Sequence, residues 1–280
     1  MAKRKSKEIR NVVVFSDTHV GCQMGLCHPD GAALDDGGTY TPSALQVKVW
    51  RLWESFWGEW VPRVTHDEPF AVVFNGDAID GSHHGSTTQW SHNLKDQVAH
   101  AEKIFAPGVE ACEGRYYHIR GTEAHVGQSG NEEERLAKAV GAIADGQGRY
   151  ARWELWKRIA KNLVHFTHHI GTTSSSAHET SAINAELASA FNESGRWGHE
   201  APAIIVRSHR HRSAEIRLPA AWGYATAIVT AAWQLKTPFV YRIPGGRNST
   251  PQIGGALIRH GDEELHTRTW VHDIGRTPEE

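Results

Sequence analysis

Residues 11–19 read Asn-Val-Val-Val-Phe-Ser-Asp-Thr-His, an apolar run that stops abruptly at Asp17 and His19. Four apolar residues in a row suit a strand that is buried on both faces, and the polar pair then lies where the strand leaves the sheet. Open α/β sheets bind their ligands at such carboxyl ends. The stretch therefore predicts a buried strand with a functional site directly after it.

Four later runs have the same form, because each is apolar and ends in Asp, His or a glycine turn followed by polar residues. They lie at 71–77, 116–121, 163–169 and 203–211. Since ligands bind at the carboxyl ends of such strands, we expect the five ends to converge on one cleft. Carboxylate oxygens and imidazole nitrogens without thiolates are ligands for Mn, Fe, Mg or Zn. The sequence therefore predicts an α/β fold that carries a metal site.

Length and charge limit the possible classes of protein. The 280 residues, of which 39% are hydrophobic, suffice for a sizeable core, and we expect a single domain over 1–280. The formal net charge of -2 excludes the broad basic field that dominates non-specific DNA binding, so any nucleic-acid contact must be local. The dense basic run in the tail at 1–9 is typical of a solvated segment.

The cysteines and the hydropathy pattern indicate a compartment. Three cysteines, an odd number without zinc-finger spacing, argue against a disulfide framework and against a thiolate metal site. No apolar stretch reaches the roughly 18 residues that a membrane span needs, and no signal-peptide core precedes the first strand. We therefore expect a soluble, cytoplasmic protein with no membrane partner. The sequence indicates no oligomeric state.

The sequence also predicts loops, helices and further strands between and after these buried strands. A glycine-rich loop at 20–41 follows the first site residues and is expected to form one wall of the cleft. Tryptophans spaced by three and four residues from Trp50 to Trp60 predict a helix whose aromatic stripe packs into the core. Alternation within 150–169 predicts two antiparallel strands, and short β-like runs in 214–272, one of them at 239–243, predict the C-terminal part of a second sheet. Helices are predicted at 42–60, 91–112, 130–144 and 175–192.

Five motifs, in this order along the chain, resemble the signature blocks of the calcineurin-like metallophosphoesterases. They are Asp17-Thr18-His19, Gly76-Asp77, Gly121-Thr122-Glu123-Ala124-His125, Thr167-His168 and Ser208-His209-Arg210-His211. The blocks cover about three quarters of the chain, and the tail after them is similar to that of members found in phage genomes. The resemblance implies a four-layer α/β fold, a β-sandwich flanked by helices, with the active site at the carboxyl ends of the strands.

The resemblance also implies two divalent metal ions, with Mn expected first and Fe, Zn and Mg as alternatives. Asp77 is then the carboxylate that bridges both ions. The other ligands are Asp17, His19 and His211 for the first ion, and His168 and His209 for the second. His169 is the alternative to His168, which we prefer because it directly follows the strand residue Thr167.

The third motif departs from the family pattern Gly-Asn-His, in which Asn is a ligand of the second metal and His assists the leaving group. We expect Glu123 to supply an anionic oxygen in place of Asn, with Thr122 as a hydrogen-bond partner, because a threonine hydroxyl is a poor neutral ligand. His125 is the expected general acid, since an imidazole with a pKa of about 6.5 can protonate a departing alkoxide. The predicted catalytic residues are thus Asp77, Glu123 and His125.

Four further side chains are expected to contact a substrate phosphate, namely His83, His84, Arg207 and Arg210, although an arginine of 207–212 can instead pair with a carboxylate. The predicted function is two-metal-dependent hydrolysis of phosphate esters through a metal-activated hydroxide. A phosphodiesterase or nuclease that acts on DNA, another nucleic acid or a nucleotide fits best. The alternatives are a phosphomonoesterase acting on a nucleotide or phosphoprotein, and a non-catalytic binding protein of the same fold.

Overall fold

Strand β1 (Asn11–Phe15) is buried along its whole length and lies inside a six-stranded sheet, as its apolar run predicts. The computed structural model describes residues 9–83, 85–171, 176–243 and 245–274. The other strands of this first sheet are β4 (Phe70–Asn75), β5 (Tyr116–Ile119), β6 (Ala151–Arg152), β12 (Gln252–His260) and β13 (Leu265–Asp273). Their order is β13-β12-β1-β4-β5-β6, in which β1, β4, β5 and β6 run parallel, β12 pairs antiparallel with β1, and β13 pairs antiparallel with β12.

A second sheet contains five strands in the order β10-β11-β9-β8-β7. They are β7 (Leu155–Ile159), β8 (Asn162–Phe166), β9 (Ile204–Arg207), β10 (Ala214–Ala220) and β11 (Gly223–Val229). Strands β8, β9 and β11 are parallel, and β7 pairs with β8 in antiparallel register from Leu155 opposite Phe166 to Ile159 opposite Asn162. The antiparallel pair predicted within 150–169 is therefore confirmed.

The predicted helices form, with shifted ends. Where one helix was predicted at 42–60, α1 (Ala44–Ser55), the π-helical turn η1 (Phe56–Trp60) and α2 (Val61–Thr65) follow one another. The other helices are α3 (Leu94–Ala111), α4 (Asn131–Ala139) and α5 (Glu179–Trp197), with the short 3-10 turns η2 (Gln128–Gly130) and η3 (Ser176–His178). Helix α4 ends at Ala139 rather than at 144, because Gly141 adopts a left-handed conformation with φ 78° that terminates it.

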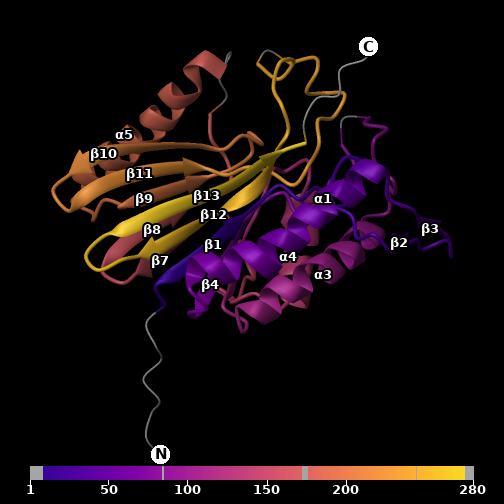
Figure 1. The fold of residues 1–280 in the computed structure, drawn as a ribbon, viewed down its shortest axis with the longest axis horizontal. Helices are drawn as coiled ribbons and strands as arrows, with labels where there is room; N and C mark the ends of the chain where they lie inside the picture. The colour runs from indigo at the N-terminus through magenta and orange to yellow at the C-terminus, as the bar shows by residue number, and fades with distance from the viewer. Residues whose placement is uncertain (1–8, 84, 172–175, 244, 275–280) are drawn as a thin grey trace, which may run out of the picture.

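The two sheets face each other, and helices cover their outer faces (Figure 1). Alternation along β1 shows how this arises: Val12 and Val14 pack between the sheets, whereas Val13 and Phe15 pack against the helices of the first sheet. Helix α5 covers the second sheet through Ile183 and Leu187. The predicted four-layer sandwich is therefore confirmed.

The tryptophan stripe belongs to the core of the helical layer. Trp50, Trp53 and Trp60 are buried, and Trp57 packs against the same cluster. Trp53 lies edge-on to Phe15 of β1 with ring centroids 5.3 Å apart. These contacts confirm that the stripe packs into the core.

Loop 20–41 only partly matches its expected place. Its first part adjoins the site, since the N–H of Leu26 donates to the carbonyl of Thr18 at 2.9 Å. Its second part forms a hairpin of β2 (Ala32–Ala33) and β3 (Thr39–Tyr40), which is tied to α3 where Asp35 N–H donates to Asp96. Only the first part therefore adjoins the site.

Two predictions about the C-terminal part are wrong. Strands β12 and β13 do not join the second sheet but extend the first, where β12 pairs with the free edge of β1. Gly255 permits this, because a Cβ there would lie 2.6 Å from the carbonyl of Val14 and 2.9 Å from the Phe56 ring. Residues 239–243 form turns instead of a strand, with Arg242 N–H donating to Phe239 and the Phe239 side chain 66% exposed.

None of the described helices is both long and apolar enough to cross a membrane. Residues 1–8 of the basic tail and His84 lie outside the described residues.

Candidate metal centre

The carboxyl ends of four strands bring the predicted ligands together. Asp17 and His19 follow β1, Asp77 follows β4, His168 follows β8, and His209 and His211 follow β9. They form two groups whose ligand atoms lie within 4.8 Å of one another: Asp17, His19 and His211 in the first, and Asp77, His168 and His209 in the second. The structure thus assembles every ligand position that the resemblance implies, and it places His168 rather than His169 in the second group.

Most of these residues have a strained backbone. Asp17, His19, Asp77, His209 and His211 adopt positive φ angles of 55°, 42°, 59°, 71° and 54°. Residues other than glycine rarely adopt this left-handed region, and each such conformation costs about 1–3 kcal/mol. The surrounding structure therefore fixes the turns that aim these side chains inward, which is typical of functional sites.

The first group has the spacing of ligands around one ion. Nε2 of His19 and Nε2 of His211 are 3.1 Å apart, and His211 Nε2 is 3.2 Å from Asp17 Oδ1. Two ligand atoms about 2.1 Å from the same ion lie about 3.0–3.4 Å apart. Asp17 Oδ1 is buried and has no hydrogen-bond partner among the described residues. An orphaned carboxylate oxygen beside two facing imidazole nitrogens fits a cation between them.

The second group has a fourth member that the sequence assigned differently. His168 Nε2 lies 3.0 Å from Asp77 Oδ2, and Thr122 Oγ1 lies 3.2 Å from that oxygen. The same hydroxyl is 3.4 Å from His168 Nε2 and 3.1 Å from His209 Nδ1. The Thr122 hydroxyl therefore lies in the second donor group at the position where we expected the Glu123 carboxylate. Glu123 is exposed and belongs to none of the donor groups found among the described residues, so its inward rotation does not occur.

Asp77 lies between the two groups. Its Oδ2 is 3.0 Å from His168 Nε2 in the second group and 3.8 Å from His19 Nε2 in the first. The N–H of Thr122 donates to its other oxygen, Oδ1, at 2.6 Å. A carboxylate held in this way can contact two ions, as the bridging role requires.

The electrostatics of the metal-free centre favour a cation. Burial alone would lower the pKa of His168, but the charges of Asp77 and Asp17 and a hydrogen bond to Asp77 raise it to about 10. Its Nδ1 donates to the carbonyl of Asn75 at 2.7 Å, which aims Nε2 at the centre. His168 therefore carries a proton at neutral pH, and metal binding must displace it.

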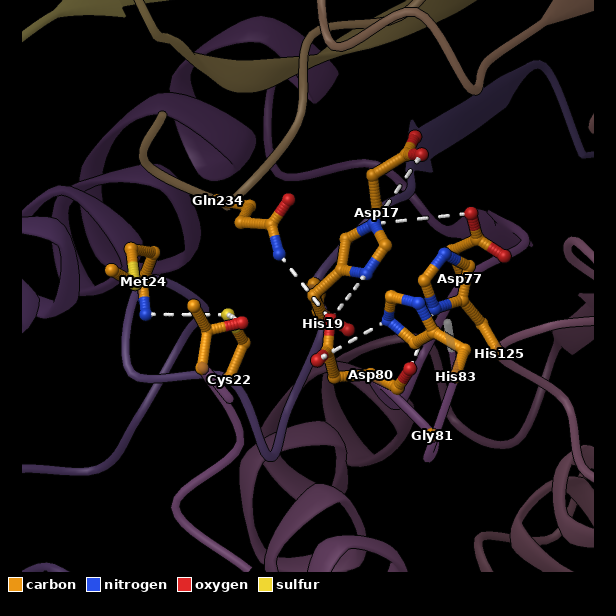
Figure 2. Close-up of polar contacts among 12 residues, drawn as sticks. Asp17, His19, Cys22, Met24, Asp77, Asp80, Gly81, His83, His125 and Gln234 are labelled. Atoms are coloured by element: carbon orange, nitrogen blue, oxygen red, sulfur yellow. Dashed lines mark hydrogen bonds and ion pairs between the residues drawn. The ribbon is translucent and has the colours of Figure 1, made fainter. Parts of the chain in front are cut away.

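Asp80 is a residue of the candidate site that the sequence reasoning missed. Figure 2 shows it beneath His19, whose Nδ1 lies 3.2 Å from Asp80 Oδ1, while Gln89 Nε2 donates to the other oxygen at 2.5 Å. Burial would raise the pKa of Asp80, yet hydrogen bonds with His19 and His83 hold it below its usual range. The ionised carboxylate thus fixes the orientation of His19. The available signal was a second Asp three positions after Asp77 in the same turn.

His125 reaches the centre from the third motif. Its Nδ1 donates to the carbonyl of Asp80 at 2.6 Å, and its ring lies 4.6 Å from that of His19 and 4.5 Å from that of His83 (Figure 2). Burial lowers the pKa of His125 to about 4, although the charge of Asp77 opposes this. The pKa expected from the sequence was therefore too high, and the imidazole is neutral in the metal-free protein.

The arginines of the last motif make structural contacts. Arg207 is only 5% exposed, and its guanidinium contacts Glu186 at 3.1 Å and the carbonyl of Val206 at 2.9 Å. Its predicted contact with substrate is wrong, because the side chain is buried against α5. Arg210 donates to the carbonyls of Gly171 and Glu179, and Arg212 pairs with Glu179 at 2.8 Å.

Two facing sheets between helical layers, with donors at the ends of β1, β4, β5, β8 and β9, are the arrangement that the resemblance to calcineurin-like metallophosphoesterases implies. The chain folds as a mixed α/β sandwich of two facing sheets between helical layers. Its Asp and His groups are a candidate dinuclear metal centre.

Neither a family model nor a curated protein matches the sequence. Similar solved structures include a predicted phosphoesterase from Streptococcus pneumoniae TIGR4, with 10% identity and a TM-score of 0.36 over 95% of this chain and 98% of that chain. Vacuolar protein sorting 29 from Cryptosporidium parvum has 7% identity and a TM-score of 0.34 over 94% of this chain and 98% of that chain. Sulfate thiohydrolase SoxB from Thermus thermophilus has 9% identity and a TM-score of 0.39 over 96% of this chain and 57% of that chain. These values are low, and the candidate metal centre therefore rests on the donor atoms of this chain alone.

Gly121 leaves no room for a side chain beside the candidate bridge. A Cβ at this position would overlap Oδ1 and the backbone nitrogen of Asp77. We expect Gly121→Ala to weaken binding of the second ion at least about 100-fold and to destabilise the fold by about 1–3 kcal/mol. Metal titration and thermal unfolding measure the two effects. Gly195→Ala in α5, with no atom within 4 Å of the added Cβ, is the control and should leave metal binding intact. Wild-type affinity in Gly121→Ala would contradict the geometry.

Thr122→Val tests whether the hydroxyl is a ligand. Valine keeps the shape of threonine but offers no oxygen to the second ion, so we expect the affinity for that ion to fall about 10-fold while the first ion binds as before. Competition with a metal chelator gives both affinities. Thr39→Val, at an exposed position of β3, controls for the loss of a hydroxyl elsewhere. Unchanged affinity for both ions would leave Thr122 as a hydrogen-bond partner of Asp77 alone.

Proposed function

We propose that this chain is a two-metal-dependent phosphodiesterase, and that DNA or another nucleic acid is its substrate. The observation that carries the proposal is the pair of oxygen and nitrogen donor groups with Asp77 between them. A donor set of carboxylates, imidazoles and a hydroxyl, without thiolate, suits Mn first and Fe, Zn or Mg as alternatives. When bound, two such ions supply a hydroxide nucleophile at neutral pH and neutralise charge on the transferring phosphoryl group.

In this proposal the protein's own groups orient the ligand imidazoles and protonate the leaving oxygen. Asp80 holds His19, and the carbonyl of Asn75 holds His168, so both imidazoles keep one nitrogen directed at the centre. His125 lies at the edge of the same centre, with Nδ1 engaged by the Asp80 carbonyl and Nε2 available for proton transfer. We assign to His125 the protonation of the leaving oxygen.

The charge around the centre favours a diester over a monoester. Among the contacts that the structure describes for the two donor groups, none comes from a lysine or arginine. A monoester dianion requires more positive charge than a diester monoanion, and Arg207 is committed to Glu186. His83, beside His125, remains a proposed contact to a phosphate. Arg210, which lies between His209 and His211 in the sequence, would reach a phosphate only by leaving the carbonyls of Gly171 and Glu179.

Turnover of two chromogenic esters with Mn tests the proposal. We expect bis-p-nitrophenyl phosphate to be hydrolysed faster than p-nitrophenyl phosphate, and labelled single- or double-stranded DNA to be cleaved. Preference for the monoester with intact DNA would support a phosphomonoesterase acting on a nucleotide or phosphoprotein. No turnover of either ester by protein that holds two ions would support a binding protein.

A further inference from the structure

Glu133 is a buried acidic residue that joins two turns of the metal centre. It lies in the first turn of α4 and is 0% exposed. Its Oε1 accepts a hydrogen bond from the N–H of Ala78 at 2.9 Å, and its Oε2 accepts one from the N–H of Gly121 at 2.8 Å. One carboxylate therefore holds two backbone segments that are 43 residues apart in the sequence, since 121 minus 78 is 43.

These two amides belong to residues next to two members of the second donor group. Ala78 directly follows Asp77, and Gly121 directly precedes Thr122. Thr122 in turn donates its N–H to Asp77 Oδ1 at 2.6 Å and places its hydroxyl 3.2 Å from Asp77 Oδ2. The distance between the Asp77 turn and the Thr122 turn, and with it the spacing of the second group, thus depends on the Glu133 carboxylate.

Tyr116, His118 and the N-terminus of α4 surround the buried side chain of Glu133. Burial and the charge of Glu133 raise the pKa of Tyr116, so its phenol stays protonated and can donate to His118 Nδ1 at 2.9 Å. The proton on His118 then lies on Nε2, which faces Glu133 Oε2 at 3.8 Å. The N-terminus of α4 adds a favourable dipole. Glu133 thus lies behind the ligand turns, beside His118, and belongs to none of the donor groups found among the described residues.

The neighbouring acids of the same turn do not share this position. Glu134 accepts hydrogen bonds from Tyr150 and Ala151 and pairs with Arg120, so it supports the β5–β6 edge of the sheet. Glu132 lies 3.8 Å from Arg135 of its own helix. Among these three acids, only Glu133 bonds to the turns that carry Asp77 and Thr122.

We propose that Glu133 is a positioning residue for the second metal ion, because it fixes the turns of Asp77 and Thr122 at the spacing that this ion requires. The inference rests on the proposed metal centre. In Glu133→Gln one carboxylate oxygen becomes an NH2 group that cannot accept a hydrogen bond, so one of the two turns loses its anchor. Changes behind ligands typically weaken metal binding about 10- to 100-fold, and we expect this range for the second ion only.

The experiment compares Glu133→Gln with Glu132→Gln in the chain of 280 residues. Both remove one charge from the same helix turn, but only the first removes a bond to the ligand turns. Direct Mn titration should show weakened second-ion binding in Glu133→Gln alone, and the Mn concentration for half-maximal activity should rise with it. At saturating Mn, kcat should return to within about 3-fold of the wild type, because the ligands themselves are unchanged. A purely structural role would lower the melting temperature without changing the metal dependence, and that result would overturn the proposal.

Failure of the proposed function and failure of the proposed role of Glu133 give different results. Metal titration needs no turnover, so a wild type that binds two ions without hydrolysing either ester would contradict the proposed function and leave the role of Glu133 standing. Glu133→Asp keeps both acceptor oxygens on a shorter side chain and should show a smaller loss of affinity than Glu133→Gln. If both variants unfold even with Mn present, Glu133 holds the fold itself and the proposal fails.

Discussion

Asp77→Asn is expected to lose the second ion and to lower hydrolysis of bis-p-nitrophenyl phosphate by about three orders of magnitude or more. Asp77 is 1% exposed and lies between the two donor groups, 3.0 Å from His168 and 3.8 Å from His19. Asparagine keeps the volume but offers one neutral oxygen, which cannot serve two cations as a carboxylate does. Metal analysis of the purified variant, alongside its rate, measures both effects.

The fold should survive this substitution. The buried charge of Asp77 is paired with protonated His168, whose raised pKa depends on it, so His168 can release its proton when the carboxylate is gone. Asp262→Asn, at an exposed position, controls for the change of charge. A variant that still carries two ions at wild-type affinity would rule out the bridging role. His19→Ala should cost less activity, because Asp17 and His211 remain at the first ion.

The sequence predicted the ligands because they follow buried strands. The apolar run before Asp17 and the one before Asp77 form neighbouring parallel strands, in register from Asn11 opposite Phe70 to Phe15 opposite Phe74. Once those strands are parallel neighbours, the residues after them must lie at the same edge of the sheet. The same rule placed His168 and His209 from the other sheet.

The sequence could not predict contacts that depend on turns and on helix placement. Glu123 and Thr122 are adjacent, and only the path of the turn after β5 decides which of them faces Asp77. Glu133 lies in the first turn of α4, and nothing in its local sequence pattern indicates that this helix docks against the ligand turns. The burial of Arg207 against α5 likewise depends on tertiary packing.

The pairing of the last strands was missed for a related reason. Short runs rich in β-forming residues indicate strands but not their partners, and β12 could pair with either sheet on pattern alone. The two consecutive glycines Gly254 and Gly255 were the available signal, because strand glycines often mark a close backbone approach. Here Gly255 lies against Val14 of β1 and the Phe56 ring.

His125→Ala should lower kcat on DNA by about two to three orders of magnitude while both ions stay bound. The loss should be much smaller on bis-p-nitrophenyl phosphate, since nitrophenolate leaves readily without a proton. His92→Ala is the matched control, because His92 is an exposed histidine whose Nδ1 lies 3.3 Å from the hydroxyl of Ser82. Rates on the two substrates and metal content, measured for both variants, complete the comparison.

The lowered pKa of His125 sets the pH dependence that accompanies this loss. Burial holds the pKa at about 4 in the metal-free protein, so the acid form is scarce at neutral pH. A bound phosphate anion favours the protonated imidazole and raises the pKa in the complex. The acid must be protonated to act, so DNA cleavage by the wild type should decline as pH rises through this raised pKa. His125→Ala should lack that decline.

Equal losses on both substrates, or a loss of metal, would make His125 a ligand or a structural residue, and His83 and His169 would then be the next candidates for the acid.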